Sequence, residues 1–253
     1  TKLTPLKNMK YRNPVTRYKL NIAKGARVLE VGGGHNPHPR SNVVVDKFVD
    51  SNYHRSADIK VLKSQQFMEA DGENLPFKDK EFDYVICCHV LEHTENPEKF
   101  LREQFRVAKR GYIETPSFIG EYLCPKESHK WILLEKDQTL YLVDKKKIGF
   151  SNNVDMGELF QHYLPSNSLA FKLFERTHAN LMTVRIEWDD SFQFVIDPSE
   201  EEILRYFTHE WTYDMGDVFF TKRSRLGDMM ACVKAFFSIL SDVYINRPVS
   251  SDK

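Results

Sequence analysis

Histidine and carboxylate side chains gather at two places where they could accept a proton or bind a divalent ion. One group lies in the segment HVLEH and contains His89, Glu92 and His93. The other is His129, in the segment ESHKW, and Glu114 lies near the end of the preceding apolar run GYIET. Imidazole and carboxylate groups serve as general bases and as ligands of divalent metals. Their spacing is not diagnostic of a metal, so both roles stay open.

A glycine-rich turn upstream of these residues could hold a nucleoside ligand. Gly32 to Gly34 follow the apolar run 28–31, and a second apolar run, 43–45, is followed by Asp46. In a parallel α/β sheet the carboxyl ends of the strands meet at one crevice, so the turn and Asp46 should face the same ligand. Asp46 could then accept hydrogen bonds from two ribose hydroxyls, while the glycines let the main chain approach without a Cβ clash.

The motif around this turn resembles that of a known enzyme family. An acid, Glu30, lies two residues before the first glycine, and Pro37 takes the sixth position of a nicotinamide-binding G-x-G-x-x-G turn. The arrangement resembles motif I of the class I S-adenosylmethionine (SAM) methyltransferases, E-x-G-x-G. Asn36 stands where a third glycine is common, and Asn tolerates left-handed backbone geometry better than most residues. The resemblance implies SAM as cofactor, with Glu30 orienting it directly or through the loop.

A second stretch strengthens this resemblance. Residues 70–93, ADGENLPFKDKEFDYVICCHVLEH, are similar to the middle of the type 11 methyltransferases. In that group the acid of A-D-x-x-x-L-P-F accepts a hydrogen bond from the adenine amine, and the strand ending in HVLEH lies beneath the methionine part of SAM. The resemblance implies cofactor contacts from Glu30, Gly32, Gly33, Gly34, Asn36, Asp46, Lys47, Asp71, Gly72, Glu73 and His89.

Strand and helix signals alternate from residue 27 to residue 115. They predict a doubly wound α/β fold with a mostly parallel, seven-stranded sheet. The first crossover, 35–42, is short and contains two prolines, which favours a loop over a helix. Asn96-Pro97-Glu98 predicts a helix start, and Lys109-Arg110-Gly111 predicts its end.

The chain beyond the fifth strand predicts an insertion and the end of the sheet. The segment 117–180 interrupts the alternation, and we expect a substrate cap there that contains a hairpin of the runs 131–134 and 139–143. The runs 181–188 and 192–196 then predict two paired antiparallel strands that complete the sheet.

Helices are predicted over 156–164 and, from a capping box of Ser199 and Glu202, up to Thr208. A third, amphipathic helix over 226–244 carries an apolar stripe typical of a core or oligomer contact. We read residues 1–26 as a lead-in segment that packs over the cofactor and residues 27–253 as the methyltransferase domain.

The composition of the chain gives no support for a nucleic-acid partner or a membrane span. Lysine plus arginine equals aspartate plus glutamate, at 36 each, which gives no electrostatic case for nucleic acid. No apolar stretch is long enough for a membrane span. The four cysteines show no framework spacing, which predicts a reducing, cytoplasmic compartment, or the host cytoplasm for a viral protein. Because the chain begins with Thr, we expect that it is part of a longer multidomain polypeptide.

A further resemblance concerns the acceptor. The segments HNPHPR, residues 35–40, and ESHKW, residues 127–131, are similar to those of methyltransferases encoded among bacterial surface-glycan genes. They also resemble the C-terminal methyltransferase domain of a multidomain glycan-building protein of large algal viruses, the chloroviruses. The resemblance implies O-methylation of a sugar hydroxyl, for example on a deoxyhexose such as rhamnose, in an oligosaccharide or polysaccharide.

Aliphatic hydroxyls are very weak acids, so their methylation requires a base or a metal. We expect His129 or His93 as the base, with Glu114 in reserve, and Trp131 as a surface for a sugar ring. A divalent metal at His89, Glu92 and His93 stays open. Two alternatives also stay open: a quinone, lipid or amine acceptor, or a methyltransferase fold that serves as a non-catalytic binding module.

Overall fold

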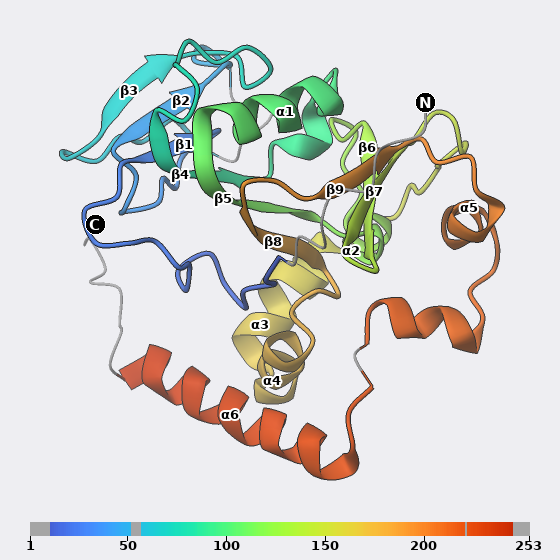
Figure 1. The fold of residues 1–253 in the computed structure, drawn as a ribbon. Coiled ribbons are helices and arrows are strands. Elements are labelled where there is room, and N and C mark those ends of the chain that lie inside the picture. Colours follow the sequence, from blue (N-terminus) through green and yellow to red (C-terminus); the bar gives the residue numbers. More distant parts are fainter. Residues whose placement is uncertain (1–10, 52–56, 221, 245–253) are drawn as a thin grey trace.

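The apolar runs that flank the glycine turn form neighbouring parallel strands at the centre of the protein. The computed structural model describes residues 11–51, 57–220 and 222–244. Its main sheet has the order β3-β2-β1-β4-β5-β8, with all neighbours parallel except β5 and β8 (Figure 1). The strands are β1 (Val28–Val31), β2 (Val43–Asp46), β3 (Gln66–Glu69), β4 (Phe82–Cys88), β5 (Ala108–Pro116) and β8 (Thr183–Asp189). The mostly parallel α/β fold is confirmed, although the described part of the sheet has six strands rather than seven.

The strand that was predicted as the seventh of the main sheet belongs to a second, smaller sheet. The prediction that β9 (Gln193–Ile196) pairs with β8 was wrong. Strand β9 instead runs parallel to β7 (Thr139–Asp144). The predicted hairpin is confirmed, because β7 pairs antiparallel with β6 (Trp131–Lys136). Phe192 and Phe194, which follow the β8 turn, contact Phe105 of the helix over 97–107.

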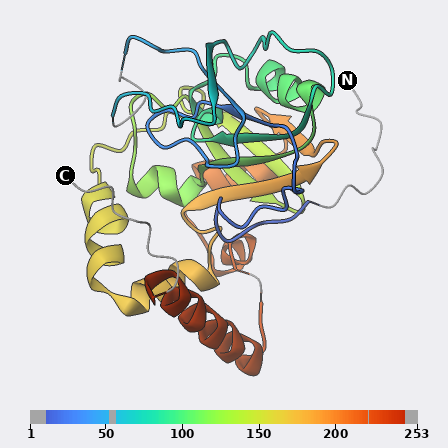
Figure 2. The same cartoon turned by 90° about the vertical axis from the view of Figure 1, so that its left-hand side faces the viewer.

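The two faces of the main sheet are covered differently. One face packs against helix α1 (Pro97–Val107) and the small sheet, in a core that includes Leu29, Phe100 and Leu133. The opposite face carries Val28, Tyr84, Ile86 and Tyr112, which pack against Leu20, Ile22 and Ala26 of the lead-in segment. Figure 2 shows the dark-blue segment beside β8, where Arg12 forms a backbone bridge with Glu187.

The first crossover, 35–42, is a loop, as predicted, since the residues between β1 and β2 form no helix. Helix α1 begins as predicted, with the Asn96 side chain accepting a hydrogen bond from the Lys99 amide at 2.9 Å. Its predicted end was wrong. The helix stops at Val107, because Ala108 is already extended and opens β5, so Lys109 lies in a strand.

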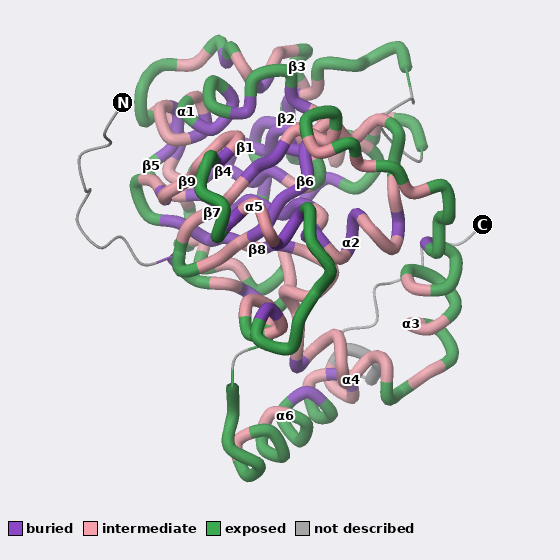
Figure 3. Tube along the Cα trace, turned by 90° about the vertical axis from the view of Figure 1, so that its right-hand side faces the viewer, coloured by how far each residue is buried: buried purple, intermediate pink, exposed green. Residues whose placement is uncertain are grey.

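Of the eight other described helical segments, three match the helices predicted over 156–164, up to Thr208 and over 226–244, and five were not predicted. The eight segments are η1 (Leu91–His93), α2 (Phe118–Leu123), η2 (Glu158–Tyr163), α3 (Leu164–Asn167), α4 (Leu169–Thr177), α5 (Glu201–Thr208), η3 (Tyr213–Val218) and α6 (Arg225–Tyr244). The capping box was wrong: Glu200 is the N-cap of α5, and it makes no side-chain capping bond. Helix α6 packs on α4 at the edge of the molecule and is largely exposed (Figure 3). Among the described residues, no helix is long and apolar enough to cross a membrane.

Candidate active site

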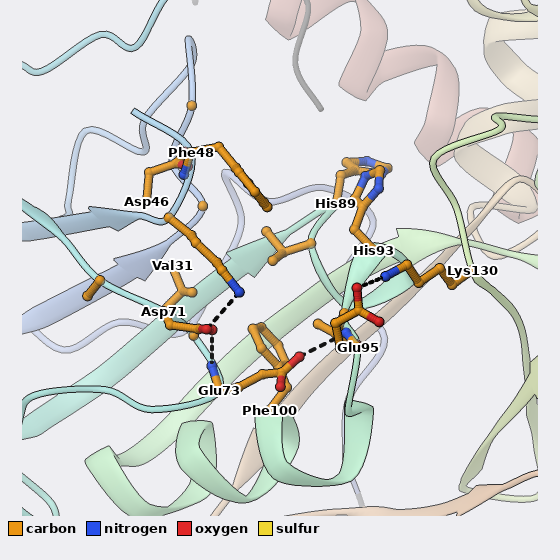
Figure 4. A pocket seen from close by; sticks show the side chains of 17 residues that line it. Val31, Asp46, Phe48, Asp71, Glu73, His89, His93, Glu95, Phe100 and Lys130 are labelled. Carbon is orange, nitrogen blue, oxygen red and sulfur yellow. Dashed lines mark hydrogen bonds and ion pairs between the residues drawn. The ribbon is translucent and has the colours of Figure 1, made fainter. Parts of the chain in front are cut away.

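A pocket opens at the carboxyl ends of the central strands (Figure 4). Most of the residues expected to contact the cofactor line it: Gly32, Gly34, Asp46, Lys47, Asp71, Gly72, Glu73 and His89. Further lining comes from Val31, Phe48, Ala70, Val90, His93, Thr94, Glu95, Phe100 and Lys130. The strand ends and the glycine turn therefore meet in one cavity, as a parallel sheet dictates.

The glycine turn leaves no room for a side chain at its first position. Gly32 has a φ of +72°, which strongly favours glycine, and a Cβ there would lie 2.2 Å from Val90 Cγ2. Its amide donates to Val45 O at 2.8 Å, which fixes the turn against β2. The main chain therefore forms part of the pocket wall, where it can be approached closely.

Two carboxylates lie on the β2 and β3 side of the pocket. Asp46 Oδ1 accepts a hydrogen bond from the Phe48 amide at 3.0 Å. Asp71 Oδ1 accepts from the Glu73 amide at 2.9 Å, and Asp71 Oδ2 lies 2.7 Å from Lys47 Nζ. Burial raises the pKa of Asp71, but the Lys47 and Glu73 hydrogen bonds outweigh it, so the net pKa is lowered. Asp71 is therefore an ionised acceptor at neutral pH.

Glu73 connects the pocket floor to the start of α1. Its Oε1 accepts hydrogen bonds from the Glu95 amide at 2.8 Å (Figure 4) and from the Asn96 amide at 3.0 Å. On the other side of the pocket mouth, Lys130 forms an ion pair with the Glu95 carboxylate. These bonds hold the loop that carries Thr94 and Glu95 along the pocket rim.

Three residues expected at the cofactor do not line the pocket: Glu30, Gly33 and Asn36. Glu30 is 1% exposed and accepts hydrogen bonds from the His38 amide and the Ser41 hydroxyl, both at 2.7 Å. It therefore lies in position to shape the turn through the loop rather than by direct contact. Asn36 is exposed, and its φ is not positive. The turn therefore does not require a residue that accepts left-handed geometry at this position.

The lead-in segment was predicted to pack over the cofactor; its described residues, 11–26, line no part of the pocket, and residues 1–10 lie outside the described part of the chain. Its contribution is indirect. Arg17 was not predicted to take part in the site. Its Nη2 atom lies 3.3 Å from Glu30 Oε1 and donates to Asn36 O at 2.9 Å. Arg17 thus braces the back of the glycine turn from the opposite face of the sheet.

His89 lies between two carboxylates at the end of β4. Its φ is +56°, its Nδ1 lies 3.3 Å from Glu92 Oε1, and its Nε2 lies 3.4 Å from Glu114 Oε1. Burial opposes a charge on the ring, but the hydrogen bonds with Glu114 and Glu92 outweigh it and raise the pKa of His89 to about 10. His89 lines the pocket and presents a cation to it.

Glu114, the reserve base, is bound by three neighbours. Its carboxylate accepts hydrogen bonds from Tyr112 and from Arg185, the latter at 3.2 Å, and it pairs with His89. Burial raises its pKa, but the His89 hydrogen bond and the Arg185 charge outweigh it and lower the pKa to about 2. A carboxylate with so low a pKa is a weak proton acceptor at neutral pH.

The two other candidate bases meet beside the pocket. The His93 and His129 rings are perpendicular, with centroids 4.7 Å apart, and His93 lines the pocket while His129 lies behind it. His129 Nδ1 lies 2.5 Å from Oε2 of Glu121, a carboxylate that is 1% exposed. Sequence reasoning missed Glu121, because nothing in the chain marks a residue on the far end of α2 as a histidine partner.

Trp131 does not offer a platform to a sugar. It is 8% exposed, belongs to the main core, and donates its indole N–H to Thr94 O at 2.9 Å. Its role is to hold β6 against the loop after η1. The aromatic character of the segment 127–131 therefore reflects packing, and the expectation of a sugar platform was wrong.

The residues of the pocket fit SAM. The backbone wall at Gly32 admits a close approach, and the carboxylates of Asp46 and Asp71 are suited to ribose hydroxyls and an adenine amine. The cationic His89 on the opposite side is suited to a carboxylate. The donor set is thus complementary to a nucleoside that carries an amino acid.

Comparisons with known proteins agree with this fit. The family model of the methyltransferase domain, of the type 11 group, matches residues 44–113. The uncharacterized protein MJ1123 of Methanocaldococcus jannaschii is 32% identical over 154 residues, which cover 56% of this chain and 72% of that protein. The C-methyltransferase UbiE of Pseudomonas fluorescens is 32% identical over 103 residues, covering 36% of this chain and 40% of UbiE.

Solved structures include a SAM-dependent methyltransferase of Aquifex aeolicus, at 22% identity, with a TM-score of 0.30, covering 37% of this chain and 58% of that one. The chain spans less than two thirds of UbiE, although it spans more of MJ1123. The domain match, the sheet order and the MJ1123 similarity place the chain among the class I SAM-dependent methyltransferases, in the family of MJ1123.

Proposed function

We propose that this methyltransferase transfers the methyl group of SAM to a sugar hydroxyl, for example of a deoxyhexose such as rhamnose, in an oligosaccharide or polysaccharide. The observation that carries the proposal is the anchored pair of His93 and His129, of which His93 lines the pocket together with His89. Bound SAM supplies an electrophilic methyl group on a positively charged sulfur. The protein must then align the acceptor oxygen with this carbon and dispose of the hydroxyl proton.

The residues divide this work between them. Asp46 and Asp71 would hold the nucleoside, and cationic His89 would hold the carboxylate of the methionine part. SAM would supply the methyl group: the acceptor oxygen would take the methyl carbon, and the sulfur would keep the electron pair of the broken carbon–sulfur bond. The hydroxyl proton leaves at the side of His93 and His129, which together with Glu92 activate the acceptor.

The rim of the pocket favours a polar acceptor. Thr94, Glu95 and Lys130 border the opening next to His93, and Lys47 lies across from them. Charged and hydroxyl groups can hydrogen-bond to a sugar, whereas an isoprenoid quinone would require an apolar channel. The similarity of the segments 35–40 and 127–131 to glycan methyltransferases supports the same acceptor class.

An acceptor screen with methyl-labelled SAM tests the proposal. The panel contains rhamnose-terminated oligosaccharides, a menaquinol, a phospholipid and a primary amine. We expect label in the oligosaccharide alone, as a methyl ether that survives alkali. Transfer to the quinol, lipid or amine without transfer to any glycan would overturn the sugar proposal, and binding of SAM without transfer to any acceptor would indicate a non-catalytic module.

A further inference from the structure

Three side chains next to the His89 side of the pocket converge in a way that the sequence did not predict. Glu92 and His93 lie on η1, directly after β4, and His129 comes from the insertion. One potential ligand atom from each of the three lies within 4.8 Å of the others. The two segments are tied together, because the Lys130 amide donates to Glu92 O at 2.8 Å.

Each histidine is anchored through one ring nitrogen. His93 Nδ1 lies 3.0 Å from the carbonyl oxygen of Ser128, and since a carbonyl only accepts, Nδ1 carries the proton. His129 Nδ1 points in the same way at the Glu121 carboxylate. In this tautomer the lone pair of each ring is on Nε2. Metal-binding histidines typically donate the other ring N–H to a carbonyl or carboxylate, which fixes the tautomer and orients the ring.

The carboxylate of the cluster is buried and is held on both sides. Glu92 is fully buried, and its Oε2 accepts from the Thr115 hydroxyl at 3.0 Å. Its Oε1 forms an ion pair with His89 Nδ1 at 3.3 Å. The Glu92 carboxylate is therefore fixed in place beside His93 and His129.

We propose that Glu92, His93 and His129 bind a divalent transition-metal ion. Two imidazole nitrogens and one carboxylate oxygen suit manganese, iron, cobalt or zinc better than magnesium or calcium, which prefer all-oxygen sites. Three protein ligands leave coordination positions open for an acceptor. The inference rests on the proposed function: an ion here would lower the pKa of the acceptor hydroxyl, whose proton would pass to water, so that no histidine has to act as a free base.

Metal binding can be measured without any acceptor. The full chain is stripped with a chelator, dialysed, and titrated calorimetrically with Mn²⁺ and, separately, Zn²⁺. We expect one ion per chain, and we expect Glu92→Gln and His129→Ala each to weaken its binding at least about 10- to 100-fold. His162→Ala, which removes an exposed histidine from η2, is the matched control and should bind as the wild type does. SAM titration of each variant reports whether the pocket is intact.

The outcomes separate the metal from the methyl transfer. Absence of uptake by the wild type, or equal uptake by wild type, Glu92→Gln and His129→Ala, would overturn the metal site. Methyl transfer to a glycan by fully stripped protein, with loss of turnover in His129→Ala, would also overturn it while leaving the proposed function intact. Tight uptake that needs Glu92 and His129, in a protein that methylates no glycan, would support the metal site and refute the sugar acceptor.

Discussion

Lys47 Nζ lies 2.7 Å from Asp71 Oδ2, so the residues that follow β2 and β3 are tied together across the cofactor pocket. The pair is partly exposed, at 47% and 38% of the two side chains, and such pairs contribute little to folding stability. Its relevance is local. The ammonium group keeps the Asp71 carboxylate ionised and oriented at the place where an adenine amine would donate.

Replacement of Asp71 should therefore affect the cofactor more than the fold. Asp71→Ala removes an ionised acceptor, and we expect SAM binding to weaken by about 1–3 kcal/mol, the range for hydrogen bonds to charged groups. Calorimetric titration measures the loss. Asp217→Ala, at an exposed acid of η3, is the control. An Asp71→Ala protein with wild-type affinity would show that this carboxylate does not contact the cofactor.

The glycine turn gives a second prediction. Gly32→Ala must accept both a left-handed φ and a Cβ that lies 2.2 Å from Val90 Cγ2. Gly149 has a similar φ of +62°, but a Cβ added there would meet no atom within 4 Å, so Gly149→Ala isolates the backbone contribution. We expect a loss of about 1–2 kcal/mol for Gly149→Ala. Gly32→Ala should lose a further amount of about 1–3 kcal/mol from overpacking, together with SAM binding.

Urea unfolding of both variants makes this comparison. Equal losses of unfolding free energy would mean that the Val90 contact relaxes without cost. Retention of SAM affinity by Gly32→Ala would contradict the role assigned to this part of the pocket wall.

A lower pH should destabilise the folded protein through His38, which lies in the loop that follows the glycine turn. This ring is 3% exposed, and its Nδ1 accepts from the Arg40 amide at 3.1 Å. Burial and the Arg17 charge lower its pKa from 6.5 to about 4. The unfolded chain therefore binds a proton between pH 6.5 and 4 that the folded chain does not, so stability falls as the pH drops through this window. One pK unit corresponds to about 1.4 kcal/mol, so the loss should be about 3 kcal/mol.

His38→Gln separates this contribution from other groups. Its amide oxygen can still accept from Arg40, but it does not titrate. The free energy of unfolding, measured in urea at several pH values from about 4 to about 7, should fall less steeply for the variant than for the wild type. Parallel curves for the two proteins would mean that His38 is not kept neutral by the fold.

The histidine pair predicts a separation of turnover from cofactor binding. His129 does not line the pocket, so His129→Ala should leave SAM affinity nearly unchanged while turnover falls by about 10²- to 10⁴-fold. Glu121→Gln should lower turnover in the same direction, because Glu121 orients the ring. Single-turnover assays with labelled SAM measure this. Equal loss of affinity and turnover would assign His129 a structural role.

The sequence predicted those features that depend on neighbouring residues. The alternation of apolar runs with turns, the Asn96 cap and the loop after β1 follow from local chemistry, and each is observed. Two acids at strand ends, Asp46 and Asp71, could be placed in one crevice because parallel strands share their carboxyl ends.

Features that depend on distant packing were not predictable in this way. The pairing of β9 with β7 joins residues far apart in the chain, such as Gln193 and Thr139, and no local pattern reveals it. The same holds for the Glu121 partner of His129 and for the burial of Trp131. Each of these depends on how the insertion folds back against the segment after β4.

Titration of the purified chain with SAM tests the central claim most directly. We predict one binding site per chain and a loss of about 1–3 kcal/mol of binding free energy in Asp46→Ala, since its carboxylate would bind the ribose hydroxyls. Absence of SAM uptake by the wild-type chain, or the same affinity in Asp46→Ala, would contradict the assignment of this pocket.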